Sequence, residues 1–274
     1  MNNQDFSKAN SPATVLIKHD RTAWLKGGSF RCQMPPKTPF GKPVRIILLG
    51  APGVGKGTQA EFICERLGPC HLSTGDVFRA AKKCSCESEL TPAMANALEY
   101  MKRGDLVPDE TVLNMVGERL RCLECTGGFL LDGFPRTVAQ AKALEQLLES
   151  HGIALTAVIN YDLPIDQIVA RISGRRTCSS CKAVYHVSTM PPKVENVCDH
   201  CGASLFQRED DRPEAVKVRM EAYETSTRPL IKFYQERGLL VNLKASGTPE
   251  EIFKRTLKVL TPKKPGTRTA TSPA

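Results

Sequence analysis

The sequence contains no apolar run that approaches the roughly 20 residues needed to cross a bilayer. It also has no leader with a long apolar segment, and its 11 cysteines are an odd number. These absences argue against a membrane protein and against a secreted disulfide framework. We therefore expect a soluble protein in a reducing compartment. That compartment would be the cytoplasm, or a mitochondrion or other organelle if residues 1–43 are a transit peptide.

Outside its two ends, the sequence has little net charge. The whole chain carries +9, but residues 1–43 contain seven basic and two acidic residues, and residues 261–274 contain three basic residues and no acidic one. Residues 44–260 are left with a net charge of +1, which gives no field for holding a polyanion. We predict that the protein does not bind nucleic acid.

Composition divides the chain into a central domain, residues 44–260, and two terminal extensions. Residues 1–43 mix Ser, Thr, Asn, Pro and basic residues with few acidic ones. That composition is shared by transit peptides and by disordered tails, so both interpretations stay open. Residues 261–274 are predicted to be a disordered basic tail. The central domain is long enough to bury a sizeable core.

Residues 50–58, here called the phosphate loop, join the apolar run 44–49 to a segment with helical spacing. Their sequence is GAPGVGKGT. Four glycines let the backbone turn its N–H groups around an anion, and the following helix adds its positive N-terminal end. Lys56 supplies a charge for β- and γ-phosphates. The match to G-x-x-x-x-G-K-[ST] is imperfect, because Gly57 takes the hydroxyl position and Thr58 follows one residue late.

Apolar runs alternate with helical patterns along the central domain. Strands are predicted at 44–49, briefly within 71–76, and at 129–131, 157–161 and 239–241. Helices are predicted at 60–67, 77–83, 92–103, 109–122, 138–148, 165–172, 213–234 (kinked at Pro229) and 250–260. This alternation predicts an α/β fold in which helices cover both faces of a parallel sheet. Ligands bind at the carboxyl ends of such strands, so residues 50–58 and 132–136 should meet in one cleft.

Four cysteines within residues 174–211 are spaced like two zinc knuckles. Cys178 and Cys181 form one C-x-x-C pair, and Cys198 and Cys201 form another sixteen residues later. Four thiolates fill a tetrahedral zinc site and leave no position for water, so such an ion would be structural. Two disulfides, four free thiols and a nucleic-acid-binding zinc ribbon are the alternatives. We favour a metal-stapled flap, because the segment interrupts an α/β domain and has no basic-aromatic face.

Arginines collect where the predicted loops should face the cleft. Any single one is most simply a surface residue, but beside a phosphate loop they suggest charge neutralisation during phosphoryl transfer. They are Arg79, Arg136, Arg171, Arg175, Arg208 and Arg219. Asp132, at a strand end, is placed to anchor the water shell of Mg²⁺, and a helix N-cap is its alternative role.

These motifs, in this order, resemble the adenylate kinase family from about Val44 to Leu260. The matching segments are residues 50–58, STGD at 73–76 with Arg79, LDGFPRT at 131–137 with Gln140, GRR at 174–176, and R-x-D-D at 208–211 with Arg219. The resemblance accounts for the late Thr58. It implies a P-loop NTPase-like parallel sheet flanked by helices, inserted AMP-binding helices in residues 73–107, and a long lid of the zinc type at residues 174–211.

The resemblance also implies an activity, namely reversible Mg²⁺-dependent phosphoryl transfer in which ATP and AMP give two ADP. ATP would be held by Gly53, Val54, Gly55, Lys56, Gly57, Thr58, Arg171, Arg175 and His186. AMP would be held by Thr74, Arg79, Asp105, Leu106, Val107, Gly133, Phe134, Pro135, Arg136, Gln140, Arg208 and Arg219. The groups expected around the transferring phosphoryl are Lys56, Asp132, Arg136, Arg175, Arg208 and Arg219. Gln140 would recognise the adenine edge, and His186 has a lid-stabilising role as its alternative.

Other functions stay open at this point. One is the same fold with a different base choice, either a GTP-using AMP kinase or a pyrimidine monophosphate kinase. Another is a nucleotide-dependent binding module whose zinc knuckles contact RNA or a protein. The cleft arginines argue against the module, because sensing needs fewer groups around the γ-phosphate. We expect a monomer that uses Mg²⁺ with ATP and carries a structural Zn²⁺.

Overall fold

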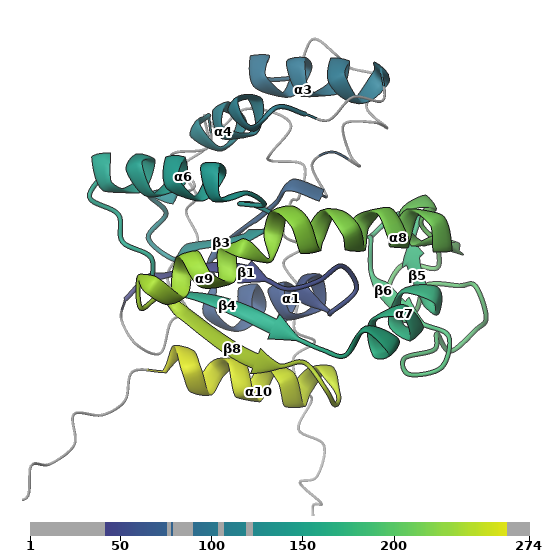
Figure 1. Cartoon of the computed structure of the whole chain (residues 1–274). Helices are drawn as coiled ribbons and strands as arrows, with labels where there is room; N and C mark the ends of the chain where they lie inside the picture. The colour runs from purple at the N-terminus through teal and green to yellow at the C-terminus, as the bar shows by residue number, and fades with distance from the viewer. Residues whose placement is uncertain (1–41, 76–77, 79–89, 104–106, 119–122, 262–274) are drawn as a thin grey trace, which may run out of the picture.

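The computed structural model describes residues 42–75, 78, 90–103, 107–118 and 123–261 (Figure 1). The predicted helix 77–83 apart from Phe78, the candidate AMP ligands Arg79, Asp105 and Leu106, and nearly all of both terminal extensions lie outside these ranges. Among the residues described, no helix has the length and apolar composition that a bilayer span requires.

Five strands form a parallel sheet in the order β2-β3-β1-β4-β8. The strands are β1 Val44–Leu49, β2 Cys70–Ser73, β3 Gly128–Asp132, β4 Ala157–Asp162 and β8 Leu240–Lys244. The predicted parallel sheet is therefore confirmed. Its last strand extends to Lys244, three residues past the predicted end, because residues 242–244 continue the pairing with β4.

Helices cover both faces of the sheet, as predicted. Ile46 and Leu48 of β1 belong to one hydrophobic cluster, whereas Ile47 and Leu49 belong to the other. The first cluster receives side chains from α1 (Lys56–Leu67), α7 (Ile165–Ser173) and α10 (Pro249–Leu260). The second receives them from α3 (Pro92–Arg103), α4 (Asp109–Gly117), α6 (Val138–Ser150) and α9 (Pro229–Glu236). Each fully buried aliphatic side chain contributes about 1.5–3 kcal/mol, so both faces fix the strand ends that carry the site.

Helix α4 is shorter than predicted. The pattern predicted a helix over residues 109–122, but α4 ends at Gly117, and the N–H of Glu118 donates to the carbonyl of Asn114 as a C-cap. Residues 119–122 of that prediction lie outside the described ranges. Gly117 has no side chain to pack and has low helix propensity, which makes it a natural end.

The predicted helix 213–234 is not one helix with a kink. It consists of α8 (Pro213–Ala222), the π-helical turn η4 (Tyr223–Thr227) and α9. Pro229 has no N–H to offer the carbonyl of Thr225. The chain adopts the wider pattern instead, with the Arg228 N–H 2.8 Å from the Tyr223 oxygen. The Thr225 hydroxyl adds a bond of 2.9 Å to the Glu221 carbonyl. In Figure 1 these three segments form one long rod that begins with α8 and ends with α9.

Residues 174–211, here called the lid, contain a separate antiparallel sheet in the order β6-β5-β7. Its strands are β5 Arg175–Cys178, β6 Val184–His186 and β7 Leu205–Phe206, and the 3₁₀ helix η3 (Glu209–Asp211) follows. The lid buries its own small cluster of Cys178, Tyr185, Cys198 and Leu205. A core of this size does not hold a fold together without a further link.

The N-terminus of α10 is fixed next to the helix that follows the phosphate loop. Thr248 and Glu251 form a capping box. The Thr248 hydroxyl accepts a 3.3 Å bond from the Glu251 N–H, and the Glu251 carboxylate accepts a 2.9 Å bond from the Thr248 N–H. The adjacent Pro249 carbonyl accepts a 2.9 Å bond from the Gln59 side chain of α1. The cap therefore orders the place where α10 supports α1.

We expect Thr248→Ala to lower the free energy of unfolding by about 1 kcal/mol, because it leaves the Glu251 N–H without its acceptor. Urea denaturation followed by circular dichroism measures the loss. Thr261→Ala at the other end of α10 is the control, with an expected effect below about 0.5 kcal/mol. Equal losses in the two variants would contradict the capping role.

Candidate active site

The phosphate loop passes close to β4 and α7, which explains two of its glycines. Gly50 has a φ of 134°, and a Cβ there would lie 2.5 Å from the Tyr161 carbonyl oxygen. Gly53 has a φ of 81°, and its Cβ would lie 2.2 Å from the Ile172 side chain. A side chain at either position would push the loop off the sheet. Gly57, in contrast, has open space around it.

Lys56 begins α1 and folds back over the phosphate loop. Its Nζ donates to the Gly50 and Ala51 carbonyl oxygens, at 2.7 and 3.0 Å. Burial lowers the pKa of Lys56 to about 8. The negative charge of Asp132 opposes this shift, whereas the positive charges of Arg136, Arg219 and Arg175 add to it. Charged groups from β3 and the loop after it, from the lid and from α8 therefore all act on the Lys56 ammonium group.

Asp132 ends β3 directly beside the strand that leads into the phosphate loop. It is paired in register with Leu48 of β1 and with Ser73 of β2, which confirms that residues 50–58 and 132–136 meet. The N-cap of α6 is Thr137, so the alternative role of Asp132 as a helix cap is wrong. Its carboxylate is partly exposed and lies 3.9 Å from the His71 Nε2.

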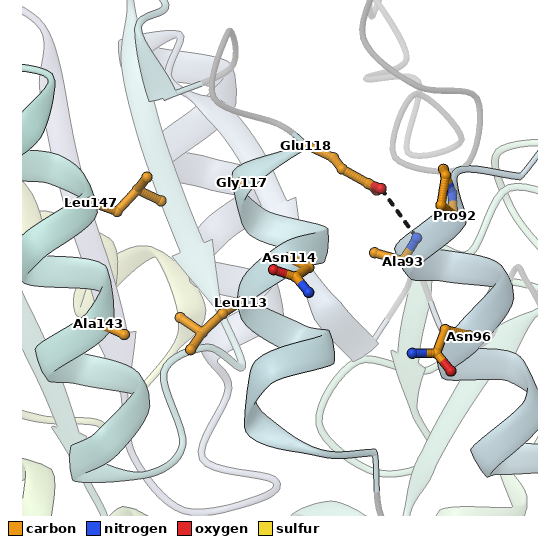
Figure 2. Close-up of a pocket in the computed structure, with 9 residues that line it drawn as sticks. All are labelled: Pro92, Ala93, Asn96, Leu113, Asn114, Gly117, Glu118, Ala143 and Leu147. Carbon is orange, nitrogen blue, oxygen red and sulfur yellow. Dashed lines mark hydrogen bonds between the residues drawn. The ribbon is translucent and has the colours of Figure 1, made fainter.

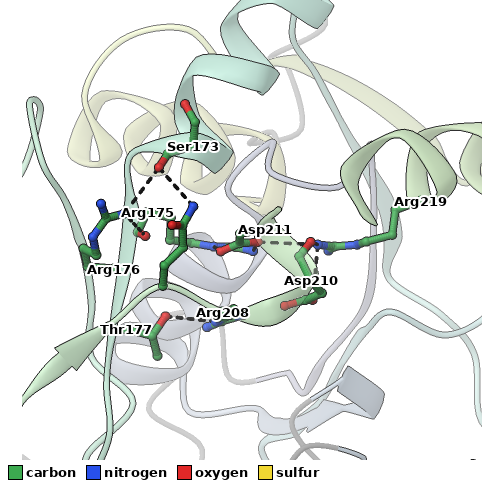
Figure 3. A network of polar contacts seen from close by, with 9 residues as sticks. Ser173, Arg175, Arg176, Thr177, Arg208, Asp210, Asp211 and Arg219 are labelled. Atoms are coloured by element: carbon green, nitrogen blue, oxygen red, sulfur yellow. Dashed lines mark hydrogen bonds and ion pairs between the residues drawn. The ribbon is translucent and has the colours of Figure 1, made fainter. Parts of the chain in front are cut away.

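Two acidic residues of η3 hold the lid and α8 arginines (Figure 3). Both oxygens of the fully buried Asp211 carboxylate accept bonds from Arg175, one of them from Nε at 2.8 Å. Nη1 of Arg219 lies 3.5 Å from Asp211 and 3.2 Å from the Asp210 carboxylate. Arg208 donates to the Thr177 hydroxyl at 2.9 Å. Three predicted site arginines are thus positioned by neighbouring polar groups.

The sequence reasoning gave Asp211 no role, although it quoted the R-x-D-D string. The available signal was a pair of adjacent acids lying between two arginines that were both assigned to a phosphate. A bidentate carboxylate is the geometry that best holds a guanidinium in a fixed orientation.

Arg171 connects the phosphate loop to the loop after β8. Its guanidinium donates to the Val54 carbonyl at 3.1 Å and to the Ala245 carbonyl at 2.8 Å. Burial lowers the pKa of this group. The predicted contact of Arg171 with the ATP base stays a prediction, but its position joins two loops at the same edge of the sheet.

His186 packs on the joint between α7 and the lid. Its Nδ1 accepts bonds from the N–H groups of Ser188 and Thr189, at 3.1 and 3.2 Å. Its Nε2 lies 3.3 Å from the Ala170 carbonyl, and a Cβ on Gly174 would come within 2.3 Å of that nitrogen. This geometry matches the lid-stabilising alternative, and the predicted contact of His186 with ATP stays a prediction.

The residues predicted to hold AMP gather at the ends of β2 and β3. Thr74 and Arg136 both donate to the Gly133 carbonyl, at 3.0 and 2.9 Å. Gln140 is buried, with Oε1 accepting a 2.7 Å bond from the Arg136 N–H and Nε2 donating a 2.6 Å bond to Asp109. Asp109 is a second residue that the sequence reasoning missed, although an acid after Pro108 at a predicted helix start was visible.

Three other predicted AMP contacts are apolar. The side chain of Phe134 is 1% exposed in the core, Pro135 is also buried, and Val107 packs against the same cluster. Contact between Phe134 and a ligand would therefore have to come from its backbone.

An open cavity of about 660 Å³ lies away from these charged groups, between α3, α4 and α6 (Figure 2). Leu113, Ala143 and Leu147 give it apolar walls. Glu118 closes one side by accepting a 3.1 Å bond from the Ala93 N–H at the start of α3. None of its lining residues belongs to the phosphate-binding groups.

The four lid cysteines are brought together as the spacing predicts. Their sulfurs all lie within 4.8 Å of one another, with 3.4 Å between Cys178 and Cys201 and 3.5 Å between Cys181 and Cys198. A tetrahedral zinc with bonds of about 2.3 Å holds its sulfurs roughly 3.8 Å apart, so the cluster fits this ion. Hydrogen bonding from the Ala203 N–H lowers the pKa of Cys201 to about 6, while burial raises that of Cys181 to about 12. A bound cation would favour the ionised form of Cys181, the thiol whose pKa is raised.

A glycine loop after the first strand, a half-buried lysine, and arginines supplied by the lid and α8 define a P-loop phosphotransferase. A family model described as adenylate kinase matches residues 48–239. The chain is 49% identical to the adenylate kinase of Carboxydothermus hydrogenoformans over 210 residues, which covers 77% of this chain and 96% of the relative. It is 50% identical to that of Caldicellulosiruptor bescii and 48% identical to that of Streptomyces avermitilis, with 79% of this chain and 97% of each relative covered. The chain belongs to the adenylate kinase family, whose activity is that of a nucleoside monophosphate kinase.

Because the pKa of Lys56 is lowered to about 8, its charge is present below that pH and lost above it. We expect kcat/KM for ATP, which reports the free enzyme, to fall above about pH 8. The fall in kcat should come at higher pH, because bound phosphate stabilises the ammonium ion. Initial rates between pH 7 and 10 test this. Lys254→Gln on the exposed face of α10 should leave the profile unchanged, and a flat wild-type kcat/KM profile would contradict the assignment.

Proposed function

We propose that this chain transfers the γ-phosphoryl group of ATP to AMP, reversibly, with the donor on the phosphate loop and the acceptor at the ends of β2 and β3. The observation that carries the proposal is the convergence on Lys56 of Asp132, Arg136, Arg175 and Arg219. A site that only binds a nucleotide does not need cations from the lid and α8 as well as its own lysine.

The donor phosphates would lie against the N–H groups of residues 53–58 at the N-terminus of α1. Lys56 would exchange its bonds to the Gly50 and Ala51 carbonyls for bonds to phosphate oxygens. Arg171, already fixed between Val54 and Ala245, would border the ATP base. Such preformed contacts reduce the ordering that binding requires.

The acceptor needs no strong general base, because AMP carries an ionised phosphate at neutral pH. Its oxygen forms the new bond to the γ-phosphorus as the bond to the β,γ-bridging oxygen breaks, and ADP leaves. Arg136, Arg175, Arg208 and Arg219 would neutralise the equatorial oxygens during this transfer. Alignment and charge stabilisation then account for most of the rate.

Adenylate kinases use Mg²⁺ with ATP, and Asp132 is the residue that would orient its water shell. The bound ion supplies positive charge at the β- and γ-phosphates. The lid would close over the site and exclude water, which otherwise would accept the phosphoryl group. His186 and Gly174 lie at the joint about which such a closure would occur.

We expect AMP to be the best acceptor in a coupled assay of AMP, CMP, UMP and GMP, with ATP and GTP compared as donors. Lys56→Met should lower kcat by roughly 100-fold or more, because it removes a charge that contacts the transferring group. Failure of AMP to accept from either donor would refute the acceptor assignment. An intact cellular function in Lys56→Ala without detectable transfer would favour a nucleotide-dependent binding module.

We infer that Cys178, Cys181, Cys198 and Cys201 hold one structural zinc ion that links the turn after β5 to the segment before β7. Elemental analysis should find about one zinc per chain. Chelation should increase amide exchange across residues 174–211, because the lid core is too small to hold alone. Cys198→Ser should abolish the metal, whereas Cys70→Ser, outside the lid, should keep it. Absence of zinc together with unchanged lid exchange after chelation would refute the site.

A further inference from the structure

The amide of Gln140 is held at both ends. Its Oε1 accepts a 2.7 Å bond from the backbone N–H of Arg136, and its Nε2 donates a 2.6 Å bond to Oδ1 of Asp109. Gln140 is only 5% exposed. A backbone N–H can only donate and a carboxylate can only accept. These two neighbours therefore permit one orientation of the amide and disfavour the flipped one.

The second oxygen of Asp109 extends this control to the start of α6. Oδ2 accepts a 2.8 Å bond from the Thr137 hydroxyl, which itself accepts a 3.1 Å bond from the Gln140 N–H. One carboxylate thus fixes both the N-cap of α6 and the side chain three residues later. The charged acceptor makes the bond to Gln140 stronger than a neutral pair would be.

We propose that Asp109 is a positioning residue that sets the base preference of the acceptor site, by fixing which atom of the Gln140 amide donates and which accepts. The inference rests on the proposed function, in which Gln140 recognises the base of AMP. In the fixed orientation, Oε1 keeps a second lone pair and Nε2 keeps a second hydrogen.

This arrangement matches adenine and opposes 6-oxopurines. Adenine offers an amino donor at position 6 and an acceptor at N1, whereas hypoxanthine and guanine offer an oxygen acceptor and an N–H donor at these positions. The amide held by Asp109 pairs with the first pattern. A flipped amide would pair with the second pattern. In that orientation, however, the amide NH₂ would face the Arg136 N–H, which is also a donor, and the amide oxygen would face the Asp109 carboxylate, which is also an acceptor.

A helix-dipole effect is the competing explanation for Asp109, because an acid in the first turn of any helix is stabilising. Glu110 is the adjacent acid in the same turn of α4 and is exposed. Glu110→Ala therefore removes the same charge from the same turn without touching Gln140, and serves as the matched control.

The test compares kcat/KM for AMP and for IMP at saturating ATP in the wild type, Asp109→Ala, Asp109→Asn and Glu110→Ala. We expect Asp109→Ala to lower the AMP:IMP ratio by about 3- to 10-fold, through KM for AMP, with KM for ATP within twofold of wild type. Asp109→Asn still offers an amide oxygen to Nε2 and should retain most of the preference. Glu110→Ala should retain all of it. An unchanged ratio in Asp109→Ala, or an equal loss in Glu110→Ala, would overturn the inference.

A second measurement does not depend on activity. The side-chain amide protons of Gln140 can be assigned by the loss of their signals in Gln140→Ala. In the ligand-free wild type these protons should exchange slowly with solvent. Their chemical shifts should change strongly in Asp109→Ala but not in Glu110→Ala. Amide signals that are the same in Asp109→Ala and wild type would overturn the positioning role. Wild-type protein that transfers nothing to AMP would instead overturn the proposed function, and with it the base preference, while these amide signals still report the orientation.

Discussion

Repulsion among like charges is the constraint on which the rest of this site depends. Lys56 lies within the influence of three arginines, and each positive charge disfavours the others as long as no phosphate is bound. Asp211 holds two of those guanidinium groups from a fully buried position. Burying a carboxylate is costly unless its partners have good geometry. The two oxygens of Asp211 meet that condition, so the cations stay in place before a nucleotide arrives.

Most of the fold could be predicted because its signals are local. Residues 46–49 and 157–159 are apolar runs that only a sheet covered on both faces can bury. The errors arose where one residue changes the backbone pattern. Gly117 ends a helix that apolar spacing alone would extend, and Pro229 produces a π-helical turn where a kink was expected. The spacing of apolar side chains does not show which backbone carbonyls of a helix lack an N–H donor.

The sequence predicted those site residues to which the family resemblance assigns a contact with a nucleotide. Residues 50–58 and 132–136 do meet, and the four lid cysteines come within reach of one ion. Asp211 and Asp109 were missed because each acts by hydrogen bonding to other side chains of the site. Asp109 and Gln140 are 31 positions apart, and no local pattern shows that two such side chains share a hydrogen bond.

The π-helical turn has a consequence for how the lid is connected to the rest of the molecule. Val216 and Met220, before the turn, pack into the cluster on one face of the sheet, whereas Leu230 and Phe233, after it, pack into the cluster on the other. Each residue of an α-helix advances the angular position of its side chain by about 100°. The one extra residue in the turn therefore rotates the second half of the rod relative to the first. A single rod can in this way pack into both cores, so the segment that leaves the lid is anchored on both faces of the sheet.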